Sequence, residues 1–139
     1  MKNRVVVITG ATGVLGQLAA HTFAEGGASL ALLSNDQEKL DALARDLNLP
    51  EERILTHTAD LLDADAVRDA AEAVSAKFGR MDALIHLVGG WTGGKTIAES
   101  DADDFAFMLN QHTWNRKSIG FDGRKVFSLY PYRKILSHE

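Results

Sequence analysis

The stretch RVVVITGATGVLG, residues 4–16, decides the fold of this chain. Its four consecutive β-branched residues, 5–8, are typical of a strand that is buried on both faces. Glycines follow at positions 10, 13 and 16, and an alanine-rich stretch of helical character comes next. A strand, a glycine loop and a helix in this order present free backbone N–H groups and a positive helix end to an anion. The stretch therefore predicts a unit that binds the diphosphate of a dinucleotide.

The composition is that of one globular domain without disulfides. The chain has 139 residues, 45% of them hydrophobic, and no cysteine, which excludes thiolate metal sites and a cysteine nucleophile. No apolar run approaches the ~20 residues of a membrane span, and no secretory signal pattern is present. A net charge of −4 argues against a nucleic-acid partner. We therefore expect a cytoplasmic protein with no metal site, no membrane contact and no nucleic-acid partner.

Apolar strands alternate with amphipathic helices along most of the chain. Strands are expected at 5–8, 28–33, 53–58 and 83–88, and helices at 16–25, 36–47, 63–78 and 101–112. The inward residues are expected to be Leu18, Ala19, Phe23 and Ala24 in the first helix and Phe105, Met108 and Leu109 in the last. This alternation predicts an α/β fold, with a Rossmann-like, doubly wound parallel sheet in a three-layer αβα arrangement. Ligands of such sheets bind at the carboxyl ends of the strands.

With these elements the chain resembles the short-chain dehydrogenase/reductase family over residues 3 to about 113. That family opens with a strand and a TGxxxGxG loop, and here Gly10 and Gly16 match its first and last glycines. Val14 stands at the place of the middle glycine, while Gly13 gives the GxxGxxG spacing of extended and atypical members. We expect the Val14 side chain to hinder the close approach that glycine permits. The resemblance implies a fold that is incomplete relative to the family.

The resemblance also implies an NAD or NADP cofactor. Its contacts would come from Thr9, Gly10, Thr12, Gly13, Val14, Leu15, Gly16, Ser34, Asn35, Asp60, Leu61, Gly89 and Gly90. No carboxylate stands at Ser34 or Asn35 to repel a 2′-phosphate, which favours NADP slightly, although no arginine follows. Asp36 is an alternative ligand of the ribose hydroxyl, or it caps the next helix.

Asp60 and Leu61 match the family's pair of an aspartate and a hydrophobic residue, in which the aspartate accepts from the adenine amino group. The alternative is that Asp60 caps the following helix, for which Asp63 is better placed. After the fourth strand the family has NNAG, and the aligned residues here are 86–89, HLVG. Gly89 and Gly90 are expected to let the backbone approach the nicotinamide ribose, and His86 to be a hydrogen-bonded core residue rather than an acid or base.

Family chemistry is hydride transfer between the cofactor and a carbonyl or alcohol substrate, with Ser, Tyr and Lys moving the proton. Asn110 matches the family's helical asparagine, which holds a water and the lysine, or is a capping or surface residue. Ser128, Tyr130 and Lys134 give the remaining match, but the serine lies two residues from the tyrosine instead of about twelve. We expect this chain to lack the catalytic set, and an inactive nucleotide-binding module stays an alternative.

The amino-acid composition of the chain changes near residue 114. Residues 114–139 hold six Lys or Arg against two Asp or Glu, and five of the ten aromatic residues. We therefore expect residues 1–113 to form the dinucleotide-binding domain. The remainder is expected to be an atypical basic and aromatic tail with a candidate fifth strand at 125–129.

A competing motif lies at residues 89–96, GGWTGGKT, which match GxxxxGK[ST]. In a nucleoside triphosphate site Lys95 would reach the β- and γ-phosphates and Thr96 would bind Mg²⁺. The motif requires a helix that starts at the lysine, and residues 97–104 lack an apolar helical face.

Self-association is the last expectation. A sheet that ends at the strand at 83–88 leaves an apolar edge unpaired, and such edges pair with other chains. We therefore expect a homo-oligomer.

Overall fold

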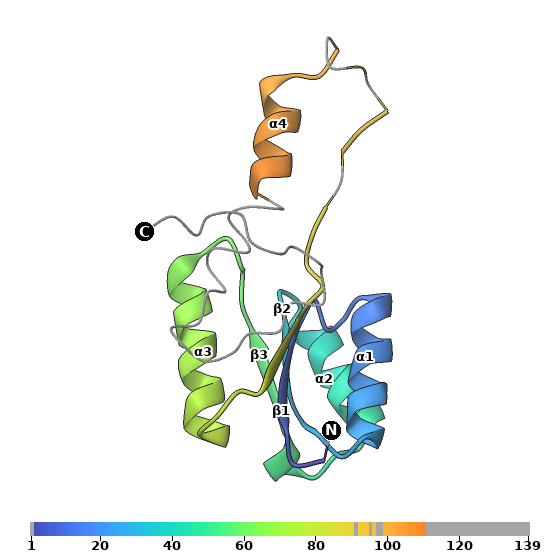
Figure 1. Ribbon diagram of the computed structural model, residues 1–139, viewed down its shortest axis with the longest axis vertical. Helices are drawn as coiled ribbons and strands as arrows, with labels where there is room; N and C mark the ends of the chain where they lie inside the picture. The colour runs from blue at the N-terminus through green and yellow to red at the C-terminus, as the bar shows by residue number, and fades with distance from the viewer. Residues whose placement is uncertain (1, 91, 95, 97–98, 111–139) are drawn as a thin grey trace, which may run out of the picture.

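The computed structural model describes residues 2–90, 92–94, 96 and 99–110 (Figure 1). The strands are β1 (Val5–Thr9), β2 (Ser29–Ser34), β3 (Ile54–Thr58) and β4 (Ala83–His86), and the helices are α1 (Val14–Glu25), α2 (Gln37–Leu47), α3 (Ala64–Phe78) and α4 (Ala102–Leu109), with a short 3-10 helix η1 (Glu51–Arg53). The predicted α/β alternation is confirmed. The bounds of the strands and of the first three helices lie within about two residues of those expected from the sequence.

The strands form one parallel sheet in the order β3-β2-β1-β4. Helices α1 and α2 cover one face of this sheet and α3 covers the other, which gives the three layers of a Rossmann-like fold (Figure 1). The sheet places β1 in its interior and β4 at one edge of the described part. All carboxyl ends of the strands therefore lie at one end of the molecule, where the chain passes into the glycine loop and towards α4.

Two apolar cores hold the sheet between its helices. Val5 and Val7 point to the α3 side and Val6 and Ile8 to the α1 and α2 side, as the alternation of a strand requires. All five residues of β1 are buried, which confirms a strand buried on both faces. Burying each aliphatic side chain contributes about 1.5–3 kcal/mol relative to leaving it exposed.

Two expectations about helix faces are wrong. In α1, Ala19, Phe23 and Ala24 pack against the core as expected, but Leu18 is 63% exposed, because the helix turns its small residues, Gly16 and Ala20, towards the sheet. Phe105 and Leu109 are 66% and 39% exposed, because α4 stands beyond the carboxyl ends of the strands instead of lying on a face of the sheet (Figure 1). In the described part of the chain, no helix has the length and apolar character to cross a bilayer.

Asp82 stabilises the amino-terminal end of β1, which is the end away from the glycine loop. Its Oδ2 accepts from the backbone N–H of Val5 at 2.8 Å, and its Oδ1 pairs with Arg4 at 2.9 Å and with Arg80. Burial by itself would raise the pKa of this carboxyl. The hydrogen bonds from Arg80, the Val5 N–H and Arg4 outweigh burial and lower the pKa from 3.8 to about 2.

We expect Asp82→Asn to lower the free energy of unfolding at pH 7 by about 1–2 kcal/mol, because the lowered pKa reflects a stabilised carboxylate in the folded state. A lowered folded-state pKa stabilises above the unfolded pKa and loses this effect as pH falls. The difference between wild type and variant should therefore shrink from pH 3.8 towards pH 2. Urea unfolding across this range measures it, with exposed Asp69→Asn as the control. A gap that is independent of pH would contradict the assignment.

Candidate functional site

The glycine loop brings α1 onto the end of β1 at a distance that only glycine allows. Gly10 has a φ of +69°, and a Cβ there would lie 3.1 Å from the carbonyl oxygen of Leu87. A Cβ on Gly16 would lie 2.2 Å from the carbonyl oxygen of Gly10 and 2.7 Å from the backbone of Ala11. Gly10 therefore allows the turn of the loop, and Gly16 allows the close packing of α1 on it. Gly13 is less constrained, because its Cβ would meet only the Gly10 oxygen at 3.4 Å.

The N-terminus of α1 has no side-chain cap. Gly13 occupies the capping position, and the first backbone bond of the helix runs from the N–H of Gln17 to the Gly13 oxygen at 2.9 Å. The N–H groups of residues 14–16 consequently have no acceptor within the helix, and no acidic side chain stands in its first turn. The Val14 side chain is 86% exposed, so it does not pack into the loop. This helix start has the free donors and the positive dipole end that suit a phosphate group.

Backbone bonds hold the loop to both neighbouring strands. The N–H of Ala11 donates to the carbonyl oxygen of Leu33, beside the end of β2, at 3.1 Å. The N–H of Leu87, just after β4, donates to the carbonyl oxygen of Thr9 at 3.2 Å. The loop is therefore fixed at the centre of the carboxyl-terminal end of the sheet.

Two side-chain hydrogen bonds repeat this pattern. The hydroxyls of Thr12 and Ser34 lie 2.7 Å apart, and we call this contact the β2 tie. The Thr9 hydroxyl and the His86 Nδ1 also lie 2.7 Å apart, and we call this contact the β4 tie. The predicted hydrogen bond of His86 is confirmed, although the residue is half-buried and does not belong to the buried core. Sequence reasoning missed both pairings, because their members lie 22 and 77 positions apart and no local pattern links them.

The end of β2 is where an adenosine ribose would lie in a sheet of this kind. Ser34 is 8% exposed and its hydroxyl is engaged in the β2 tie, whereas Asn35 is exposed. Asp36 caps α2, because its Oδ1 accepts from the backbone N–H of Lys39 at 3.1 Å. Its Oδ2 lies 2.8 Å from the Lys39 ammonium, and these hydrogen bonds lower the pKa of Asp36 and raise that of Lys39. The capping interpretation of Asp36 is confirmed, and Lys39 adds a cation that the sequence analysis overlooked.

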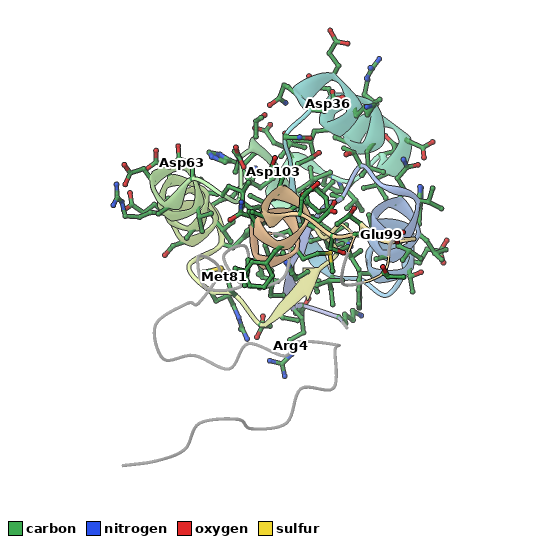
Figure 2. The ribbon with its side chains drawn as sticks, turned by 90° about the horizontal axis from the view of Figure 1, so that it is seen from above. Arg4, Asp36, Asp63, Met81, Glu99 and Asp103 are labelled. Carbon is green, nitrogen blue, oxygen red and sulfur yellow. The ribbon has the colours of Figure 1, made fainter. Side chains whose placement is uncertain are left out.

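Asp60 and Asp63 have different roles in the turn between β3 and α3. Asp63 caps α3 by accepting from the N–H groups of Asp65 and Ala66, so the capping alternative for Asp60 is wrong. Asp60 instead accepts from the N–H of Leu62 at 2.9 Å, and its side chain stays exposed. Leu61 is buried in the core on the α3 side, which fixes the backbone beside Asp60. Seen from above, Asp36 and Asp63 stand at helix starts on opposite sides of the sheet (Figure 2).

Gly89 and Gly90 follow β4 by a few residues at this same end of the sheet. Asn110 is exposed and lies at the C-terminal cap of α4, where its N–H donates to the carbonyl oxygens of Ala106 and Phe107. Ser128, Tyr130 and Lys134 lie outside the described residues, as does the whole of the expected tail. Among the described residues, no three His, Asp or Glu side chains gather as metal ligands would.

The described residues of the GxxxxGK[ST] match and of the segment after it do not show the helix that a triphosphate site requires. After β4 the next helix in the described part is α4, which begins at Ala102 instead of at the lysine. The hydroxyl and the N–H of Thr96 both donate to Glu99 Oε2 at 2.9 Å, so the hydroxyl proposed for Mg²⁺ is already engaged. Lys95 lies outside the described residues.

A small apolar cleft lies beneath the site, between the sheet and α3. It is lined by Val7, Thr9, Leu33, Leu61, Val67, Ala70, Ala71, Val74 and Leu84. Its space of about 20 Å³ suffices for about one water molecule. A ligand of nucleotide size therefore belongs across the rim of the sheet and not inside this cleft.

We expect Gly16→Ala to lower the free energy of unfolding by about 3 kcal/mol, because the added methyl group meets backbone atoms that cannot move aside without displacing α1. Gly13→Ala is the matched control, since its methyl group has room, and it should cost less than about 1 kcal/mol. Urea unfolding of the two variants measures the difference. Equal effects would contradict the close contact between α1 and the loop.

Comparisons with known proteins agree with this geometry. Residues 4–113 match the family model described as short chain dehydrogenase. The chain is 37% identical over 117 residues to dehydrogenase/reductase SDR family member 7B of Bos taurus and 35% identical over 103 residues to meso-2,3-butanediol dehydrogenase of Serratia marcescens. These matches cover 79% and 74% of this chain but only 36% and 40% of the relatives, so the chain spans less than half of their length.

Solved structures give the same result. A short-chain dehydrogenase/reductase of Brucella melitensis, titled glucose/ribitol dehydrogenase, superposes with a TM-score of 0.75 at 33% identity, over 86% of this chain and 50% of that one. A 3-ketoacyl-(acyl-carrier-protein) reductase from the same organism, complexed with NADH, has a TM-score of 0.73 at 24% identity, over 85% and 48%. The family model, the relatives and the shared fold together establish that the chain belongs to the short-chain dehydrogenase/reductase family.

Proposed function

We propose that this chain binds a nicotinamide dinucleotide across the carboxyl ends of β1 and β2, with NADP(H) preferred over NAD(H). The observation that carries the proposal is the uncapped start of α1, which Gly10 and Gly16 bring to the centre of this rim. Three N–H groups without helical acceptors and the positive end of the helix dipole favour binding of the diphosphate. The exposed Val14 and Leu15 side chains would border the cofactor on the solvent side.

The adenosine half would lie over the ends of β2 and β3. The exposed carboxylate of Asp60 has the chemistry to accept from the adenine amino group, with the buried Leu61 holding its backbone in place. Gly89 and Gly90, with no side chains, would leave room for the nicotinamide ribose beyond β4. The Thr9, Thr12 and Gly13 backbone completes the loop around the diphosphate.

The preference for NADP(H) rests on charge at the end of β2. Ser34 and Asn35 carry no carboxylate, and the carboxylate of Asp36 is engaged by Lys39. A 2′-phosphate would therefore meet the balanced charges of the Asp36–Lys39 pair instead of an unpaired negative charge. NAD(H) is the second candidate, because one structural neighbour is complexed with NADH.

The reaction we propose is hydride transfer between this cofactor and a small carbonyl or alcohol substrate, in the cytoplasm. The nicotinamide supplies the hydride when it is bound, and a protein group must exchange a proton with the substrate oxygen. We propose that this chain lacks the complete set for this transfer, because Ser128 lies two residues from Tyr130 instead of about twelve. In an active chain Tyr130 would exchange the proton, with Lys134 lowering its pKa, Ser128 orienting the carbonyl and Asn110 holding a water. Binding without turnover of any carbonyl substrate would identify the chain as a nucleotide-binding module instead.

We expect NADPH to bind more tightly than NADH, and Mg-ATP to show no comparable affinity. Isothermal titration calorimetry of the full chain with each nucleotide measures this directly. Equal affinities for NADPH and NADH would contradict the role of Lys39 and the missing carboxylate. Absence of binding by both dinucleotides would overturn the proposed function.

A pair of variants tests the adenine contact in the same assay. Asp60→Ala should weaken NADPH binding about tenfold, the effect of one charge-assisted hydrogen bond. Asp63→Ala removes the cap of α3 and should lower stability while leaving the affinity within about twofold. An affinity that is unchanged in Asp60→Ala would contradict the adenine role.

We also propose that the chain forms a homo-oligomer. In the described residues β4 is an edge strand, and its buried Leu84 and Ile85 lie next to unpaired backbone groups on the outer side. A second copy could satisfy these groups by continuing the sheet. Multi-angle light scattering should give a mass of at least twice 15.1 kDa, and a single monomeric species would contradict this.

A further inference from the structure

The β4 tie has no role in the proposed binding of the cofactor so far, and it joins the two segments on which that binding depends. Thr9 is the last residue of β1 and directly precedes Gly10, the turning point of the glycine loop. His86 is the last residue of β4 and directly precedes the segment that leads to Gly89 and Gly90. Thr9 and His86 are paired in the parallel register of the two strands. Their side chains therefore meet at the exact junction between the sheet and both cofactor-facing segments.

The contact is well formed and shielded. The distance of 2.7 Å between the Thr9 hydroxyl and the His86 Nδ1 is that of a good hydrogen bond. Thr9 is only 2% exposed, so its hydroxyl cannot exchange this partner for bulk water without moving the loop. The neighbouring backbone bond, from the Leu87 N–H to the Thr9 oxygen at 3.2 Å, is longer. The side-chain bond thus supplements a backbone bond at the place where the sheet stops.

The junction is also sterically tight. A Cβ on Gly10 would meet the Leu87 carbonyl oxygen at 3.1 Å and a methyl group of Val88 at 3.2 Å. Any separation of β4 from β1 at this level would therefore move Gly10 away from the Leu87–Val88 backbone. Because Gly10 in turn contacts Gly16 in the first turn of α1, such a displacement would reach the N–H groups that face the diphosphate.

We infer that His86 is a positioning residue, which holds the glycine loop in its binding geometry through Thr9. The inference rests on the proposed function, since it concerns the affinity of the same site for a dinucleotide. The residue acts on the ligand through Thr9 and the loop and not by touching the ligand itself. His86 thus joins β4 to the loop, at a position where the family pattern has an asparagine.

The experiment compares substitutions that remove the hydrogen bond with substitutions that keep it. His86→Leu and Thr9→Val remove the bond with little change in volume, whereas His86→Asn and Thr9→Ser keep a polar partner. His57→Leu is the matched control, because His57 lies next to the end of β3 at the far edge of the described sheet. Calorimetric titration with NADPH gives the dissociation constant of each variant, and thermal unfolding gives its stability.

We expect His86→Leu and Thr9→Val each to weaken NADPH binding about fivefold, as the loss of one hydrogen bond would. The double variant should bind no more weakly than either single variant, because both remove the same bond. His86→Asn, Thr9→Ser and His57→Leu should stay within about twofold of the wild type. If His86→Leu does not fold, the contrast between Thr9→Val and Thr9→Ser gives the same answer.

Three results would overturn the inference. Wild-type affinity in Thr9→Val or His86→Leu would mean that the tie does not position the loop. Additive losses in the double variant would mean that the two residues act separately. Losses that His86→Asn fails to rescue, and that follow the melting temperature alone, would assign His86 a purely structural role. Failure of the wild type to bind either dinucleotide would remove the proposed function and this inference together, which distinguishes it from the other results.

Discussion

The contact between Gly16 and the carbonyl oxygen of Gly10 is the constraint on which the rest of this structure depends. A Cβ at Gly16 would lie 2.2 Å from that oxygen, so α1 can start where it does only because the residue is glycine. This position of α1 sets where its free N–H groups lie and directs its small residues towards the sheet. It also leaves Val14, Leu15 and Leu18 exposed around the site. One close approach between two backbone segments therefore determines both a packing interface and the position of the proposed binding surface.

The glycine loop is connected to the strands on both of its sides, once by backbone bonds and once by side-chain bonds. Backbone bonds join the loop to the ends of β2 and β4, and the β2 and β4 ties add a side-chain bond on each side. The positioning of donors before a ligand arrives reduces the entropic cost of binding. Such preorganisation is valuable where the ligand is an anion, since loose N–H groups would be solvated by water instead. The four hydrogen-bonding side chains therefore connect the loop to both neighbouring strands.

Much of the fold was predictable from the sequence. Runs of β-branched residues form strands, glycines end them and aspartates cap helices, and each of these effects depends on residues that are close in the sequence. The strands, the Asp63 cap and the turn at Gly10 all follow from neighbours within a few residues. Ala19, Phe23 and Ala24 of α1 pack against the core as predicted, but Leu18 does not, because hydrophobic periodicity weights large residues whereas close packing selects Gly16 and Ala20. The face of α4 was wrong because the sequence pattern does not reveal whether a surface exists to cover Phe105. The pairing of Thr12 with Ser34, and of Thr9 with His86, depends on strand order, which no local signal encodes.

The two ends of β1 have opposite physical requirements, and the chain meets them with different chemistry. At the amino-terminal end, Arg4 and Arg80 balance the negative charge of the Asp82 carboxylate, and the Val5 N–H donates a hydrogen bond to it. This charge is therefore compensated within the protein. At the carboxyl-terminal end the loop is held by hydroxyl and imidazole groups and by no carboxylate, while the N–H groups of α1 stay without helical acceptors. A carboxylate used as a tie at this second end would compete with a diphosphate for the same donors. Ties without a carboxylate therefore hold the loop in place and leave its N–H groups available to an anionic ligand.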